Sequence, residues 1–177
     1  MDPAISATAA LFIGGLFLLA AGHKLADFAR FQATVRAYRL VADDMAGFLA
    51  GLAVLAELVI AGMALSIGAS WQQAGILGAM ALLALYAGVI LLNIARDNVA
   101  IDCGCLGFAA RAPRLTPALA LRNLVLVATG ALALLPISAR ALTWLDFTAM
   151  AGCLAMLALL YAGFDLAISQ SKKEIPA

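Results

Sequence analysis

The sequence predicts an all-α fold: a polytopic membrane helix bundle of about five transmembrane helices, with an interfacial helix and a cysteine-bearing loop. The first observation is composition, because 66% of the 177 residues are hydrophobic and only 12% are charged, whereas a soluble domain has about 45–50% apolar and roughly 25% charged residues. The second is that the apolar residues gather in runs near the length of about 20 residues that a membrane-spanning helix needs. We therefore expect residues 1–177 to form a single integral membrane domain.

Five apolar runs are expected to cross the membrane. Thr116 and Pro117 are typical of an N-cap and a first helical position, since proline lacks only a donor that has no intrahelical partner there. The connections at 69–72 and 138–142 are so short that the helices they join should be antiparallel neighbours. The first run lacks the positively charged start of a secretory signal, so we expect it to remain as a helix. The expected helices are residues 4–22, 46–68, 73–95, 117–137 and 143–168.

Two connections are longer than the others. Residues 24–40 place Leu25, Phe28 and Phe31 at roughly helical spacing, which favours a short helix on the membrane surface. Residues 96–116, the cysteine loop, are neither long nor apolar enough to cross the membrane twice. Irregular backbone at membrane depth is tolerated only where protein shields it, so the bundle would have to cover any part of this loop that enters the bilayer.

Basic residues predict the orientation of the bundle. Nine of them fall on one side of the expected spans, and Arg140 alone falls on the other. The positive-inside rule places the richer side in the cytoplasm, so the cysteine loop is expected to open there and the N-terminus to lie outside. The net charge of +1, without a phosphate-binding loop or a basic–aromatic patch, gives no reason to expect a nucleic-acid partner. The nine residues are Lys24, Arg30, Arg36, Arg39, Arg96, Arg111, Arg114, Lys172 and Lys173.

The cysteine loop contains the stretch IDCGCLGF, in which Cys103 and Cys105 flank Gly104. A bridge across so small a loop removes little entropy from the unfolded chain and would be strained, and strained disulfides are the oxidising ones. Gly104 permits the tight turn that such a bridge needs. Nearby arginines favour the thiolate and Asp102 disfavours it. The spacing therefore favours thiol–disulfide exchange over a structural role.

Other roles for the cysteines stay open. Metal binding is disfavoured, because zinc needs four ligands and the chain offers three cysteines and one histidine, His23, unless a partner or a second copy completes the site. Palmitoylation near the membrane surface and two unreactive thiols are further alternatives. Cys153, inside the last expected helix, is expected to be a small buried apolar side chain, and a role as a third thiol is the less favoured alternative.

Glu57 is an ionisable residue near the centre of the second expected helix. Such residues are costly in a bilayer and usually face the bundle interior with a partner. We expect Arg122, one turn inside the fourth expected helix, to be that partner, with Asn123 and Asn93 extending the cluster. One interpretation is a proton- or quinone-facing site beside the cysteine loop. The other is a protonated or ion-paired glutamate that specifies helix packing.

Several short motifs occur in an order that resembles the MauE/DoxX family of membrane proteins. The resemblance covers most of the chain, and the Cys-Gly-Cys motif in its context is the most specific part. The motifs are HKL at 23–25, YRL at 38–40, AELVIAG at 56–62, NIARD at 93–97, IDCGCLG at 101–107 and RN at 122–123.

The resemblance implies an accessory protein of methylamine metabolism in the bacterial cytoplasmic (inner) membrane. The family is associated with maturation of the light (beta) subunit of methylamine dehydrogenase, a periplasmic protein dense in disulfides, and with a thioredoxin-like partner, MauD. By this resemblance the protein would be an accessory protein for disulfide formation or isomerisation, with Cys103 and Cys105 as its redox pair. The leading hypothesis is a thiol–disulfide oxidoreductase that exchanges with the thioredoxin-like partner and passes electrons to or from a quinone, without a metal. The supporting residues would be Gly104, Glu57, Arg122, Asn123 and Asp102.

Two alternatives to this function stay open. The protein would instead be a non-catalytic membrane chaperone or anchor that holds the subunit during export and assembly. Or it would be a transmembrane electron relay to a periplasmic thioredoxin-like protein. The relay would reconcile a cysteine loop on the cytoplasmic side with a substrate that matures in the periplasm.

Overall fold

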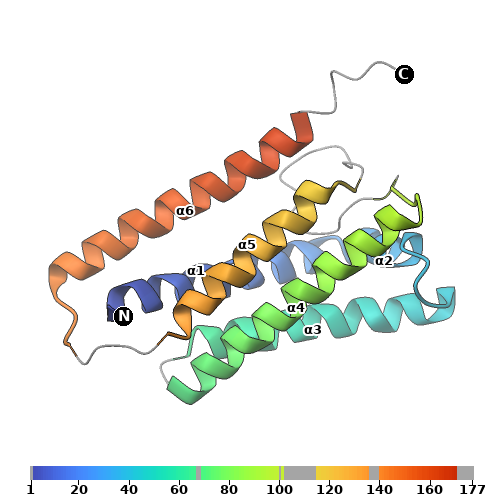
Figure 1. Cartoon of the computed structure of the whole chain (residues 1–177). Coiled ribbons are helices and arrows are strands. Elements are labelled where there is room, and N and C mark those ends of the chain that lie inside the picture. Colours follow the sequence, from blue (N-terminus) through green and yellow to red (C-terminus); the bar gives the residue numbers. More distant parts are fainter. Residues whose placement is uncertain (1, 67–68, 100, 102–114, 136–139, 171–177) are drawn as a thin grey trace.

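The fold is an all-α bundle of long apolar helices (Figure 1). The computed structural model describes residues 2–66, 69–99, 101, 115–135 and 140–170. In chain order, the elements are α1 (Pro3–Ala26), α2 (Phe28–Ala37), the short 3₁₀ helix η1 (Asp43–Met45), α3 (Ala46–Ala64), α4 (Ala69–Ala95), α5 (Pro117–Ala133) and α6 (Trp144–Gln170). Within the described ranges, α1, α3, α4 and α6 are long and apolar enough to cross a membrane, and α5 is a shorter apolar helix. The predicted polytopic membrane bundle is therefore confirmed.

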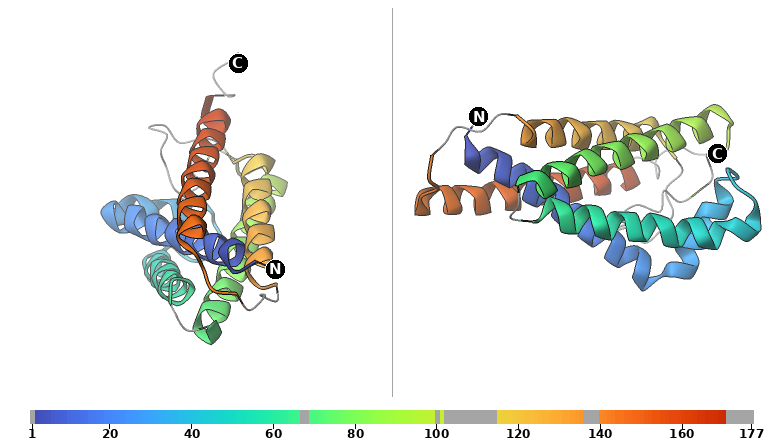
Figure 2. Two further views of the ribbon diagram at one scale, coloured as in Figure 1. Left: turned by 90° about the vertical axis from the view of Figure 1, so that its left-hand side faces the viewer. Right: turned by 90° about the horizontal axis from the view of Figure 1, so that it is seen from below.

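α1 is the central helix of the bundle. It packs against α3, α5, α6 and α4, and Figure 2 shows it crossing the other helices obliquely. Half of its most apolar stretch is buried, compared with 6% for α6. Its Ile13 and Phe17 join a hydrophobic core with Ile76 and Leu83 of α4 and Leu126 of α5. α6, in contrast, leaves most of its apolar surface exposed.

The structure changes two expectations about neighbouring segments. α1 continues to Ala26, so Lys24 belongs to the first long helix and not to the connection after it. α2 is a separate helix within residues 24–40, and its placement on a membrane surface stays a prediction. α3 and α4 are neighbours, as their short connection predicts. The short connection between α5 and α6 predicted the same for that pair, but α6 packs mainly against α1. α6 reaches α5 through an ion pair between Arg122 and Asp165.

Different polar contacts fix the two ends of the bundle. At the N-terminal end, the Arg140 guanidinium donates hydrogen bonds to Asp2 Oδ2 at 2.8 Å and to Asp146 Oδ1 at 2.7 Å. A backbone N–H in the first turn of α1, together with Arg140, lowers the pKa of the Asp2 carboxyl. At the other end, Asn98 Nδ2 donates to the carbonyl oxygen of Ala37 at 3.0 Å and so joins α2 to the segment after α4. Arg140 therefore lies at the same end as the N-terminus, as the predicted orientation requires.

α4 approaches α3 closely at Gly75. A Cβ at this position would collide with the backbone nitrogen of Ala64 and lie 2.7 Å from the carbonyl carbon of Met63. Small residues at helix contacts allow such close approach of backbones in membranes. Gly88 of the same helix differs, because a Cβ there would meet no atom within 4 Å. The close packing therefore requires a glycine at position 75 and not at position 88.

We predict that Gly75→Ala lowers the thermal stability of the purified protein in detergent, because overpacking a close contact typically costs about 1–3 kcal/mol. Gly88→Ala is the matched control. It should leave stability unchanged or raise it slightly, since alanine is better than glycine inside a helix by roughly 0.5–1 kcal/mol. Equal unfolding midpoints for the two variants would contradict the close contact between α3 and α4.

Candidate functional site

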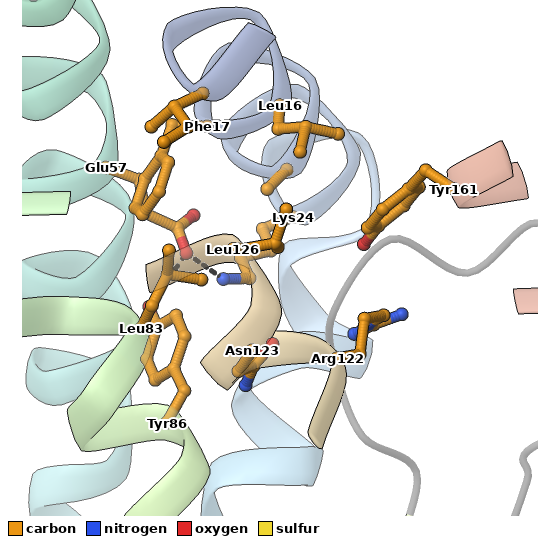
Figure 3. A pocket seen from close by; sticks show the side chains of 12 residues that line it. Leu16, Phe17, Lys24, Glu57, Leu83, Tyr86, Arg122, Asn123, Leu126 and Tyr161 are labelled. Atoms are coloured by element: carbon orange, nitrogen blue, oxygen red, sulfur yellow. Dashed lines mark hydrogen bonds and ion pairs between the residues drawn. The ribbon is translucent and has the colours of Figure 1, made fainter. Parts of the chain in front are cut away.

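Side chains from α1, α3, α4, α5 and α6 surround a small cavity (Figure 3). Its volume is about 40 Å³. Since one water needs roughly 10–15 Å³ of cavity volume, the space has room for a few waters. The residues that line it are Ile13, Leu16, Phe17, Ala20, Lys24, Glu57, Leu83, Tyr86, Arg122, Asn123, Leu126 and Tyr161.

The central interaction at this cavity is an ion pair between α1 and α3. Lys24 Nζ donates a hydrogen bond to Glu57 Oε1, and the two side chains are only 5% and 1% exposed. The Tyr86 hydroxyl of α4 donates a second hydrogen bond to the same oxygen at 2.7 Å. The Lys24 ammonium also lies 4.8 Å from the ring centroid of Phe31 and 5.0 Å from that of Tyr86, where the aromatic face attracts a cation. Each charge of the pair is therefore compensated inside the bundle.

Helical spacing explains why these two residues meet. The buried residues of α1 include Ile13, Phe17 and Ala21, and Lys24 continues the same stripe by one further turn. Glu57 likewise continues the buried stripe of α3. Residues spaced by three and four positions share one helix face. This continuation was the signal that could have identified Lys24 from sequence, and it is visible only when the first helix is extended beyond residue 22.

The predicted pairing of Glu57 with Arg122 is wrong. Arg122 Nη1 donates instead to Asp165 Oδ1 of α6 at 2.7 Å, and its guanidinium lies 5.2 Å from the ring centroid of Tyr161. The two predicted residues do line the same cavity. The physical reason is that Lys24, counted as a connection residue, enters the bundle and takes the partner position at Glu57. Asp165, near the end of the last helix, is a residue of the site that its sequence position does not single out.

The two asparagines have different roles. Asn123 is buried and lines the cavity beside Arg122. Asn93 does not line it. Its Nδ2 donates to the carbonyl oxygen of Val89 and its Oδ1 accepts from Asn98 Nδ2, both at 3.0 Å. Asp97 follows with a φ of 59°, a left-handed conformation that often ends a helix. Asn93 therefore helps to end α4 and does not extend the polar cluster.

The described ends of the cysteine loop are held together near the cavity. The backbone N–H of Leu115 donates to the carbonyl oxygen of Val99 at 2.9 Å. Ile101 and Leu115 are buried in one apolar cluster with residues of α4 and α5. The cluster includes Ala87, which directly follows Tyr86 in α4. Both described ends of the loop therefore lie beside α4 and α5, which also line the cavity.

The predicted redox pair lies outside the described residues, as do Asp102 and Gly104. Cys153, the free cysteine within the described part of α6, is exposed, so the prediction that it is buried is wrong. It points away from the packed side of a helix that contacts the bundle along one face. Among the described residues, no group of three or more His, Cys, Asp and Glu side chains could hold a metal ion.

A second cavity of about 290 Å³ lies between α2, α3 and α4. Its volume is near the lower end of the roughly 300–1,000 Å³ typical of ligand pockets. The lining is mostly apolar, and Lys24 and Tyr86 line both cavities. Of the two spaces, only this one approaches the size that a quinone head group needs. The further lining residues are Phe31, Thr34, Val35, Tyr38, Leu40, Val41, Leu49, Ala53, Leu85, Val89 and Ile90.

We predict strong energetic coupling between Lys24 and Glu57 and little between Glu57 and Arg122. Removing one partner of a buried pair leaves an uncompensated charge and costs about 3–5 kcal/mol, so Lys24→Met and Glu57→Gln should each destabilise the protein. The double variant should recover much of that loss. Thermal unfolding of the single and double variants in detergent measures the coupling, with Glu57→Gln/Arg122→Leu as the matched cycle. Coupling in the second cycle and none in the first would contradict the observed pairing.

The sequence is similar to that of one family of known proteins. The family model described as "Methylamine utilisation protein MauE" matches residues 2–136. The chain is 33% identical over 161 residues to "Methylamine utilization protein MauE" of Paracoccus denitrificans, covering 86% of this chain and 82% of the relative. It is 35% identical over 138 residues to the protein of the same description from Paracoccus versutus, covering 76% and 72%. No solved structure matches the chain. The chain therefore belongs to the MauE family of methylamine utilisation proteins.

Proposed function

We propose that this protein is a membrane thiol–disulfide redox protein of methylamine utilisation. In this proposal it assists disulfide formation during maturation of the methylamine dehydrogenase light subunit and resides in the bacterial cytoplasmic membrane. The role in methylamine utilisation is supported by family membership over most of the chain. The redox chemistry is supported by one observation above others, the Cys103-Gly104-Cys105 sequence in a loop whose described ends are fixed to the bundle.

The chemistry requires Cys103 and Cys105 to alternate between a dithiol and a disulfide. Forming the disulfide removes two electrons and two protons from the pair, and the pair returns to the dithiol when it oxidises another dithiol. A thiolate attacks a disulfide sulfur through a mixed disulfide, so a thioredoxin-like protein of the MauD type is a fitting exchange partner. A quinone in the bilayer would take up the two electrons and two protons as quinol. Of the two cavities, the larger one comes nearer to the size that such a molecule needs.

A non-catalytic chaperone or anchor is the second candidate. The observation that favours it is the long apolar surface of α6, which includes Leu159 and Met156 at 74% and 63% exposure. Such a surface is suited to lipid and equally to the membrane anchor of another protein. The two candidates differ in one requirement, because only the redox function needs both cysteines of the loop.

The first test concerns these cysteines. We predict that Cys103→Ser/Cys105→Ser abolishes maturation of methylamine dehydrogenase in cells, whereas the matched control Cys153→Ser retains it. In the wild type, alkylation and mass spectrometry should find Cys103 and Cys105 bridged after an oxidant and both alkylated after a reductant. Full maturation in the double variant, with the protein present at normal level, would favour the chaperone.

The second test concerns the side on which the loop opens. The excess of basic residues predicts the cytoplasm, which is the arrangement that a transmembrane electron relay requires. In a variant without native cysteines, a cysteine placed at Ala139 should react with a membrane-impermeant maleimide in intact cells. A cysteine at Ala112 should react only after the cells are opened. The reverse pattern would place the loop in the periplasm, directly accessible to a periplasmic thioredoxin-like partner.

A further inference from the structure

Two polar atoms around the small cavity have hydrogen-bonding capacity that the described protein groups do not satisfy. Glu57 and Asn123 are 1% and 2% exposed, and both line the cavity. Within the part of the chain that the structure describes, neither Glu57 Oε2 nor Asn123 Nδ2 has a hydrogen-bond partner. Buried polar side-chain atoms are in large majority hydrogen-bonded, and ordered water supplies the bond where protein groups do not reach.

The two atoms have complementary chemistry. A carboxylate oxygen can only accept a hydrogen bond, whereas an amide nitrogen can only donate one. Lys24 adds further donors, because its ammonium carries three N–H groups and one of them binds Glu57 Oε1. A ligand that serves this set must therefore donate and accept at once. Water does both, whereas a monatomic anion can only accept and a metal cation forms no hydrogen bond at all.

The size of the cavity also favours water as the ligand. A volume of about 40 Å³ has room for roughly three waters at 10–15 Å³ each. Its apolar residues, such as Phe17 and Leu126, would by themselves favour a dry space. However, a buried water needs two to four polar partners, and Lys24, Glu57 and Asn123 supply them.

We propose that this cavity is a binding site for ordered water. The water accepts hydrogen bonds from Asn123 and Lys24 and donates to Glu57 Oε2. It thereby joins α1, α3 and α5 in one hydrogen-bonded network within the bundle. This site does not depend on the redox activity of the cysteine loop.

The test is radiolytic hydroxyl labelling of the full-length protein in detergent, read by mass spectrometry. Water beside a buried side chain generates radicals that modify it in place. Phe17 lines the cavity and Phe12 does not, yet both are buried phenylalanines of α1, at 5% and 8% exposure. Phe17 should label several-fold faster than Phe12. After rapid mixing with ¹⁸O-water, the label should enter Phe17 later than it enters the exposed Met45, because an ordered water exchanges more slowly than solvent.

Two variants connect the labelling to the cavity. Ala20→Leu places additional side-chain volume in the cavity without removing a polar group, and it should reduce labelling of Phe17 to the rate of Phe12. Gly22→Leu adds the same side chain two residues away, where a Cβ meets no atom within 4 Å, and it should leave the labelling unchanged. Equal rates for Phe17 and Phe12 in the wild type, or ¹⁸O entry at Phe17 as fast as at Met45, would overturn the proposal. These readouts need no thiol activity, so they also distinguish failure of the water site from failure of the proposed redox function.

Discussion

The buried ion pair between Lys24 and Glu57 is the constraint on which the arrangement of the bundle depends. It joins α1, the helix with the most neighbours, to α3, and the Tyr86 hydroxyl brings α4 to the same oxygen. Apolar side chains alone do not specify how helices meet in a bilayer, because lipid tails are as apolar as leucine. A charged pair does specify it, since each partner is costly without the other. The pair therefore fixes the relative rotation of α1 and α3 and, through Tyr86, that of α4.

A second polar contact positions the peripheral helix. α6 has little buried surface, and the Arg122–Asp165 pair with the nearby Tyr161 ring brings it to α5. Both ion pairs reach the same small cavity. The helices α4 and α5 line this cavity and also hold Ile101 and Leu115, the described ends of the cysteine loop. Asn123 lies six residues after Pro117, so at 1.5 Å per residue the polar site is about 9 Å along α5 from its first residue. The ionisable groups of the bundle therefore lie near Leu115, the described end of the cysteine loop that precedes α5.

The general architecture could be predicted from sequence because composition and the length of apolar runs are strong constraints in a bilayer. Glu57, Arg122 and Asn123 could also be assigned to one polar site, since ionisable residues within membrane helices face the interior. The pairing within that site could not be predicted. It depends on where α1 ends and on which face of α5 meets α6, and both are tertiary properties. Lys24 follows a run that hydropathy ends at residue 22, yet the helix continues and carries its ammonium into the core.

Ending the first helix at residue 22 also affects the count of basic residues on each side of the membrane. Lys24 was one of nine basic residues assigned to the cytoplasmic side, but its charge is compensated by Glu57 inside the bundle. Eight basic residues then oppose Arg140, so the predicted orientation is unchanged. Cys153 illustrates a different limit, because whether a cysteine of an apolar helix is buried depends on how that helix packs. α6 contacts the bundle along one face, and Cys153 is not on it.

The central claim, that Glu57 is an ionised partner of Lys24, is tested most directly by infrared difference spectroscopy. The spectrum of the wild-type protein minus that of Glu57→Gln isolates the absorption of this one side chain, and Asp165→Asn provides a reference for a second carboxylate in an ion pair. We predict that the difference shows the paired stretching bands of an ionised carboxylate. A carbonyl band of a protonated carboxyl group in their place would contradict the ion pair and would make Glu57 a neutral hydrogen-bonding residue.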